Sequence, residues 1–148
     1  MKRIFIYYSD SGNGDTVAEY LNNKGFFIRK AVPKKPMPKA FALKILKGGF
    51  LAGIGAKTEL SGFDPDVSDF DEVVIGAPIW NGRTASPVNT VLEKTDLSGK
   101  KVTFVLYSGS GQAPKAEAKL LARFPNAKVI HLRSPRSEKE ELNKLETL

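Results

Sequence analysis

Short apolar segments that alternate with segments of helical periodicity are the feature that most constrains this chain. The apolar segments predict strands near residues 3, 27, 73, 102 and 128, with helices between them. Uninterrupted apolar strands are typical of a parallel sheet whose two faces are both covered by helices. The sequence therefore predicts an α/β fold, a three-layer sandwich around a five-stranded parallel sheet.

The expected element boundaries follow from turn residues and caps. Strands are expected at the following positions: 2–8, 26–32, 72–77, 101–107 and 127–132. Helices are expected over 16–23 and 87–94, and after Pro114, where Ala118, Leu121 and Ala122 share one face. A last helix is expected from Ser137, with Glu140 in capping-box position. Residues 33–71 are irregular, and we expect a short helix and a long loop there.

Composition limits the chemistry. The length of 148 residues predicts a single domain over residues 1–148. The absence of cysteine excludes disulfides, thiol catalysis, iron–sulfur clusters and cysteine-ligated zinc. His131 is the only histidine, and we expect it to be structural, with no metal site in the chain. No apolar run is long enough for a signal peptide or a membrane span, so we expect a cytoplasmic protein.

The positive charge is concentrated in one segment. The formal net charge is +7, and residues 24–58 contain nine Lys or Arg and no acidic residue. This segment is either a solvated basic face or a surface for anionic partners. Nothing resembles a nucleic-acid-binding module, and we expect no nucleic-acid partner.

Three loops follow the first, third and fourth strands, at the edge where open α/β sheets bind ligands. The first loop, residues 9–16, is rich in Ser, Asn and Gly and contains no Lys or Arg, so neutral N–H and hydroxyl donors would bind an anion there. The Walker A pattern is absent, and Val17 replaces the third glycine of a dinucleotide fingerprint. A simple capping turn is the alternative interpretation of this loop.

The other two loops suggest a planar ligand. Residues 76–82 include Trp80, the only tryptophan, placed either to stack on a ring or to fold back over the sheet edge. Residues 108–112 contain two glycines that let the backbone approach a ring edge. A flexible linker is the alternative for this third loop.

Taken together, the three loops resemble the flavodoxin family. Residues 8–14 are similar to its phosphate loop, 76–82 to the loop that places Trp on the flavin, and 108–111 to its third loop. The resemblance covers nearly the whole chain except residues 33–62. It implies strand order 2-1-3-4-5 and non-covalently bound FMN. The cofactor-binding residues it implies are Ser9, Ser11, Gly12, Asn13, Gly14 and Thr16 for the phosphate, Pro78, Ile79, Trp80, Asn81 and Gly82 for the ring and ribityl chain, and Ser108, Gly109, Ser110 and Gly111 for the pyrimidine side.

The sequence also departs from the family pattern. Gly14 replaces a Thr, which removes a hydroxyl donor worth about 1 kcal/mol unless Thr16 or a water takes its place. We expect the Asp10 carboxylate to point away from the phosphate. Tyr107 comes too early in the chain to cover the outer face of the ring. The basic charge, unlike the acidic charge of typical family members, predicts a less negative reduction potential.

The resemblance implies a protein that carries electrons between redox partner proteins through FMN, with no catalytic residue of its own. The alternative is an NAD(P)H-dependent FMN quinone-type reductase, with a ring face open to NAD(P)H and to quinone-like small molecules. In that alternative the basic segment, residues 24–58, would attract the nicotinamide phosphates.

Overall fold

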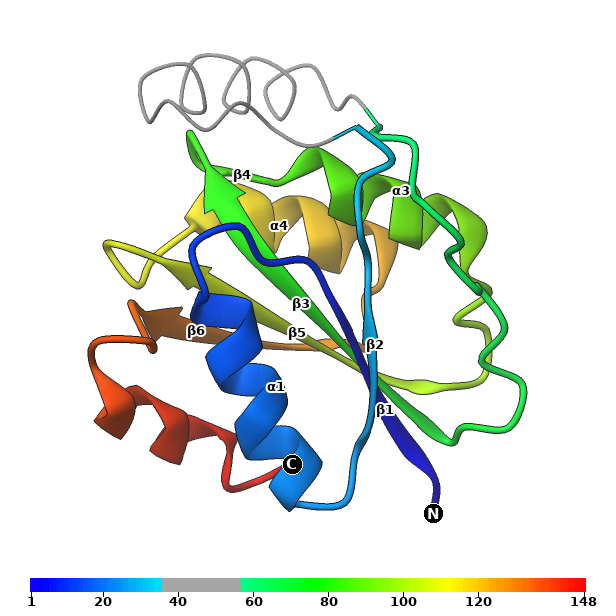
Figure 1. Cartoon of the computed structure of the whole chain (residues 1–148), viewed down its shortest axis with the longest axis horizontal. Helices are drawn as coiled ribbons and strands as arrows, with labels where there is room; N and C mark the ends of the chain where they lie inside the picture. Colours follow the sequence, from blue (N-terminus) through cyan, green and yellow to red (C-terminus); the bar gives the residue numbers. More distant parts are fainter. Residues whose placement is uncertain (36–56) are drawn as a thin grey trace.

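The computed structural model describes residues 1–35 and 57–148, and it shows a parallel sheet between two layers of helices (Figure 1). The sheet order is β2-β1-β3-β5-β6, and the parallel strands are β1 (Arg3–Tyr7), β2 (Phe27–Lys30), β3 (Glu72–Trp80), β5 (Lys101–Ser108) and β6 (Lys128–Arg133). This arrangement confirms the expected 2-1-3-4-5 order, since β5 and β6 are the fourth and fifth expected strands. A short strand not foreseen from the sequence, β4 (Arg83–Thr84), pairs antiparallel with the end of β3.

Burial explains why the central strands are continuous apolar runs. β1, β3 and β5 lie inside the sheet, and their side chains are packed on both faces. β2 is an edge strand and is shorter than expected, and its Phe27 is 55% exposed. Because β2 pairs with one strand only and none of its four residues is buried, its apolar pattern is weaker than that of the central strands.

Each face of the sheet has its own core. On one face, α1 (Asn13–Asn23) and the 3-10 helix η1 (Lys139–Leu145) bury residues such as Val17, Leu21 and Leu145. On the other face, α3 (Ser86–Lys94) and α4 (Pro114–Arg123) bury residues such as Val88 and Leu120. The helices therefore sandwich the sheet, as predicted.

Two helix starts differ from the sequence expectation. α1 begins at Asn13 rather than near residue 16, because Gly12 adopts a left-handed φ of 92° and its carbonyl accepts the Thr16 N–H. The expected capping box at Ser137 is wrong. The Ser137 hydroxyl instead donates to the Ser134 carbonyl, and η1 starts at Lys139 without a side-chain cap.

The buried face of α4 also differs from the prediction. Ala118 and Ala122 are exposed and Leu121 is half-buried, while Ala116 and Leu120 are buried. The bond between Glu117 and His131 of β6 ties this side of α4 to the sheet and fixes the rotation of the helix.

The irregular region between β2 and β3 is described only at its ends. Pro33 and Leu60 form an antiparallel bridge that brings the two ends together. The expected short helix lies outside the described residues. Asp64 and Asp66 accept N–H bonds from residues two positions onward, a turn-capping role. Within residues 1–35 and 57–148, no helix has the length and apolar character needed to cross a bilayer.

Candidate functional site

The three loops singled out from the sequence converge at one edge of the sheet. β1, β3 and β5 are parallel neighbours, so the segments that follow them lie side by side (Figure 1). The second loop is shorter than expected, since β3 extends to Trp80. Asn81 and Gly82, with φ values of 49° and 76°, then form a tight hairpin turn into β4.

The first loop is folded around a single oxygen atom. Ser9 Oγ accepts the main-chain N–H groups of Gly12 and Gly14, at 3.2 and 3.1 Å. Two N–H donors aimed at one oxygen form the kind of backbone nest that binds anions, at the positive end of α1. The Ser9 hydroxyl stands in for an anionic oxygen, and these residues therefore fit a phosphate group. The Thr16 hydroxyl is already used, since it donates to Gly12 O.

A cation that the sequence did not suggest lies against this loop. Arg136 Nη1 donates to Ser11 O at 2.7 Å, and the Arg136 main-chain N–H donates to Asn13 Oδ1 at 3.1 Å. The prediction of purely neutral donors is therefore incomplete. Arg136 also borders an open depression shared with Asp10 and Thr16. No local motif could have found Arg136, which lies 123 positions from Asn13.

Two tyrosines lie beneath the loop and explain the glycine at position 14. Tyr107 is buried, and its hydroxyl donates to Tyr8 O, so it does not cover a ring face. A Cβ atom on Gly14 would lie 2.5 Å from Tyr107 Oη and 2.8 Å from Tyr7 Cδ2. The threonine expected from the resemblance would not fit here.

Charge pairing shapes the start of α1. Partial burial acts to raise the pKa of Asp15, but hydrogen bonds from Lys30 and Tyr7 and the charges of Lys30 and Arg136 lower it overall. Burial, together with the Asp15 bond, raises the pKa of Tyr7, and burial together with the Asp10 charge raises that of Tyr8. Both tyrosines are therefore neutral, and the Tyr7 hydroxyl donates to Asp15 Oδ1 at 2.8 Å. The outward orientation of Asp10 remains a prediction.

The second and third loops present an indole and a closed turn. Trp80 is half-buried and meets Tyr8 edge-on, with ring centroids 5.8 Å apart. In the third loop, Ser108 Oγ accepts the Gly111 N–H at 3.0 Å, and Gly111 has a φ of 73°. The third loop is thus a hydrogen-bonded turn rather than a flexible linker.

His131 is structural in the described part of the fold. Its Nε2 lies 2.7 Å from Glu117 Oε2, which joins β6 to α4.

The chain matches one family model and is similar to several solved structures. The model of a family described as Flavodoxin matches residues 2–145. A crystal structure of a candidate flavoprotein from Bacteroides eggerthii DSM 20697 is 24% identical, with a TM-score of 0.82 over 99% of this chain and 96% of that one. A candidate flavoprotein from Bacteroides uniformis ATCC 8492 is 24% identical, with a TM-score of 0.72 over 86% of each chain. A flavoprotein in complex with FMN from Lactobacillus acidophilus NCFM is 19% identical, with a TM-score of 0.72 over 94% of this chain and 97% of that one. No curated protein matches the chain.

Proposed function

Since the chain belongs to the flavodoxin family, whose model matches residues 2–145, we propose that it binds FMN and carries electrons between redox partner proteins. The observation that carries this proposal is the convergence of the Gly12 and Gly14 N–H groups on Ser9 Oγ. An oxygen of the FMN phosphate would take the place of that hydroxyl. The structure of the L. acidophilus flavoprotein in complex with FMN, which shares this fold, supports the same cofactor.

Each loop would have a distinct task. Ser9, once released from the two N–H groups, would donate its own hydroxyl to the phosphate, while Arg136 balances the negative charge. Trp80 would turn its indole toward the ring, in a contact worth about 0.5–1.5 kcal/mol. The third loop would offer main-chain groups to the pyrimidine edge. Bound FMN would supply reversible electron transfer, and the chain would supply binding and electrostatics.

A second candidate function is an NAD(P)H-dependent FMN quinone-type reductase. It is favoured by two exposed cations beside the second and third loops, Arg83 after the Asn81–Gly82 turn and Lys115 at the start of α4. Neither forms an ion pair with another described residue. Such cations would suit anionic small-molecule substrates as well as acidic protein partners.

The test is a titration of the purified, flavin-free protein with FMN. Trp80 is the only tryptophan, so quenching of its fluorescence reports binding at the second loop directly. We expect saturable quenching and a protein-bound flavin absorption spectrum. Trp80→Phe should still bind FMN by absorbance but lose the fluorescence signal. A protein that binds no FMN would refute the proposal, while steady NAD(P)H oxidation by the loaded protein would favour the reductase over the carrier.

A further inference from the structure

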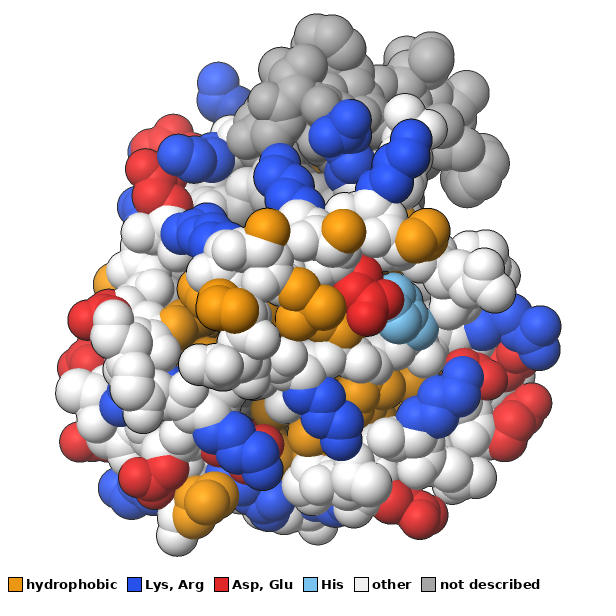
Figure 2. Space-filling model, turned by 180° about the vertical axis from the view of Figure 1, so that it is seen from behind, with side chains coloured by type: hydrophobic (Ala, Val, Ile, Leu, Met, Phe, Trp, Pro, Cys, Tyr) orange, Lys and Arg blue, Asp and Glu red, His pale blue; other side chains and the backbone are white. Residues whose placement is uncertain are grey.

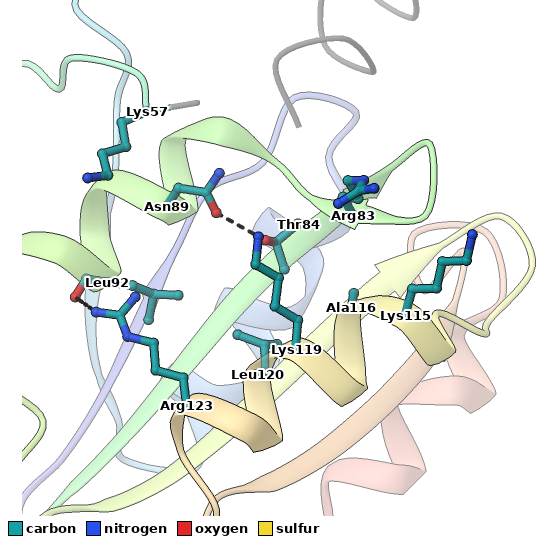
Figure 3. A pocket seen from close by; sticks show the side chains of 10 residues that line it. All are labelled: Lys57, Arg83, Thr84, Asn89, Leu92, Lys115, Ala116, Lys119, Leu120 and Arg123. Carbon is teal, nitrogen blue, oxygen red and sulfur yellow. Dashed lines mark hydrogen bonds between the residues drawn. The ribbon is translucent and has the colours of Figure 1, made fainter. Parts of the chain in front are cut away.

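A second cavity, separate from the depression at the first loop, lies between α3, β4 and α4 (Figure 3). Its volume is about 180 Å³. Leu92, Ala116 and Leu120 form an apolar floor. Thr84 and Asn89, joined by a 3.1 Å hydrogen bond, add a polar wall. A cavity with an apolar floor and a few convergent polar groups is the usual form of a small-molecule site.

Among the described residues, every charged side chain that lines this cavity is basic. The rim consists of five cationic side chains: Lys57, Arg83, Lys115, Lys119 and Arg123. No acidic residue lines the cavity among the described residues. Figure 2 shows Lys and Arg side chains gathered beside hydrophobic ones on this face.

Only part of that charge is compensated. Lys57 pairs with Glu93 at 3.1 Å, and Arg123 donates to the Leu92 carbonyl at 3.2 Å. Within residues 1–35 and 57–148, Arg83, Lys115 and Lys119 have no acidic partner. These three cations therefore give the cavity a positive potential that a bound anion would relieve.

The spacing of these cations on α4 is itself unfavourable without a ligand. Lys115, Lys119 and Arg123 recur at every fourth residue, which places like charges next to one another on one helix face. Figure 3 shows Lys119 and Arg123 extending from α4 toward β4 and α3. Glu117 does not pair with them, because it lies two positions from Lys115 and Lys119, off their face of α4, and its carboxylate contacts His131.

We infer that this cavity binds a small organic anion, a single ring bearing a carboxylate or a phosphate. The apolar floor would take the ring, and Arg83, Lys115 and Lys119 would bind the anionic group. The volume is below the roughly 300–1,000 Å³ typical of sites for larger ligands, which limits the occupant to about one ring. Because Arg83 pairs with Trp80 across the hairpin, an occupant would lie next to the second loop.

The inference is tested on the flavin-free full chain with four probes: benzoate, phenyl phosphate, the uncharged benzamide, and inorganic phosphate. Amide chemical shifts would be followed by NMR. We expect saturable shifts confined to residues 83–92 and 115–123 with benzoate or phenyl phosphate. The stronger of the two identifies carboxylate or phosphate as the preferred group. Benzamide and inorganic phosphate should bind about tenfold more weakly, since benzamide lacks the negative charge and inorganic phosphate lacks the apolar ring.

Variants distinguish binding in this cavity from non-specific attraction of an anion to a basic protein. The double substitution Lys115→Gln with Lys119→Gln should raise the Kd of the preferred probe about tenfold or more. The control pair, Lys2→Gln with Lys139→Gln, removes the same charge outside the cavity and should leave the Kd unchanged. Equal binding of benzamide, equal loss in the control pair, or absence of saturable shifts in the two segments would each overturn the inference. Failure of FMN binding would not affect this test, because no flavin is present.

Discussion

Replacement of Gly14 by alanine tests whether the first loop is packed as closely as the structure shows. The added Cβ would meet Tyr107 Oη at 2.5 Å, Ser9 Cβ at 2.7 Å and Tyr7 Cδ2 at 2.8 Å. Overpacking of this kind costs about 1–3 kcal/mol, while alanine gains about 1 kcal/mol over glycine within a helix. Because all three contacts are shorter than 3.0 Å, we place the cost in the upper part of that range and expect Gly14→Ala to lower the free energy of unfolding by about 1–2 kcal/mol net, measured by urea denaturation.

A matched control is available in the third loop. A Cβ on Gly109 would meet nothing within 4 Å, so Gly109→Ala should change stability by less than about 0.5 kcal/mol. A double-mutant cycle with Tyr107→Phe identifies the clash, because that change removes the nearest atom. Gly14→Ala should cost less in the Tyr107→Phe background than in the native chain. Equal costs at positions 14 and 109, or full additivity in the cycle, would refute the proposed packing.

Three further predictions concern the same loops. Arg136→Gln should weaken FMN binding about tenfold in a fluorescence titration and leave binding of the phosphate-free lumiflavin unchanged, so an equal effect on both ligands would contradict the assigned contact. The folded-state pKa of Asp15 is lowered, so its stabilising contribution is present above the ordinary value of 3.8 and is lost as the pH falls through the lowered value. Asp15→Asn should therefore lower the thermal midpoint at pH 7, and a difference that persists undiminished in strong acid would rule out the Lys30 pairing as its cause. Gly111→Ala should lower the urea midpoint, because φ is 73° and a Cβ would lie 2.9 Å from Arg133 Cβ. Gly111→Asn should lower the midpoint less than Gly111→Ala does, because asparagine adopts a left-handed φ more readily than alanine.

The parallel part of the sheet was predictable because each of its five strands carries a local signal. Residues 73–77 and 102–107 are buried on both faces, so these runs are almost entirely apolar and predict buried strands from pattern alone. The helix starts were less predictable. Capping depends on which main-chain group a side chain bonds, and the Ser137 hydroxyl donates to the carbonyl of Ser134 instead of accepting from an N–H of the next helix.

The charged part of the site could not be predicted, because it is assembled from distant segments. Arg136 reaches the first loop from the far end of the chain. The same holds for an uncharged contact, since Tyr107 reaches this loop from β5. The rim of the basic cavity combines Lys57, the β4 hairpin and one face of α4. The spacing of Lys115, Lys119 and Arg123 was visible in the sequence. Their proximity to Arg83 depends on how α4 is rotated, which the apolar pattern mispredicted.

Local charge, rather than net charge, will determine how this chain tunes a flavin. Near the first loop the balance is mixed, because Asp10, Asp15 and Glu19 border the same depression as Arg136. The uncompensated cations lie instead on the rim of the cavity that adjoins the second loop. Coulomb energy falls with distance and with screening, so these cations would affect a ring bound at the second loop more than the remote basic residues would. The less negative reduction potential expected from the basic composition would therefore depend on Arg83 and Lys115. An anion bound in the cavity would offset their charge and make the reduction potential of the flavin more negative. The cavity would then couple occupancy by an anion to the potential of the flavin without any change in the loop proposed to hold the phosphate.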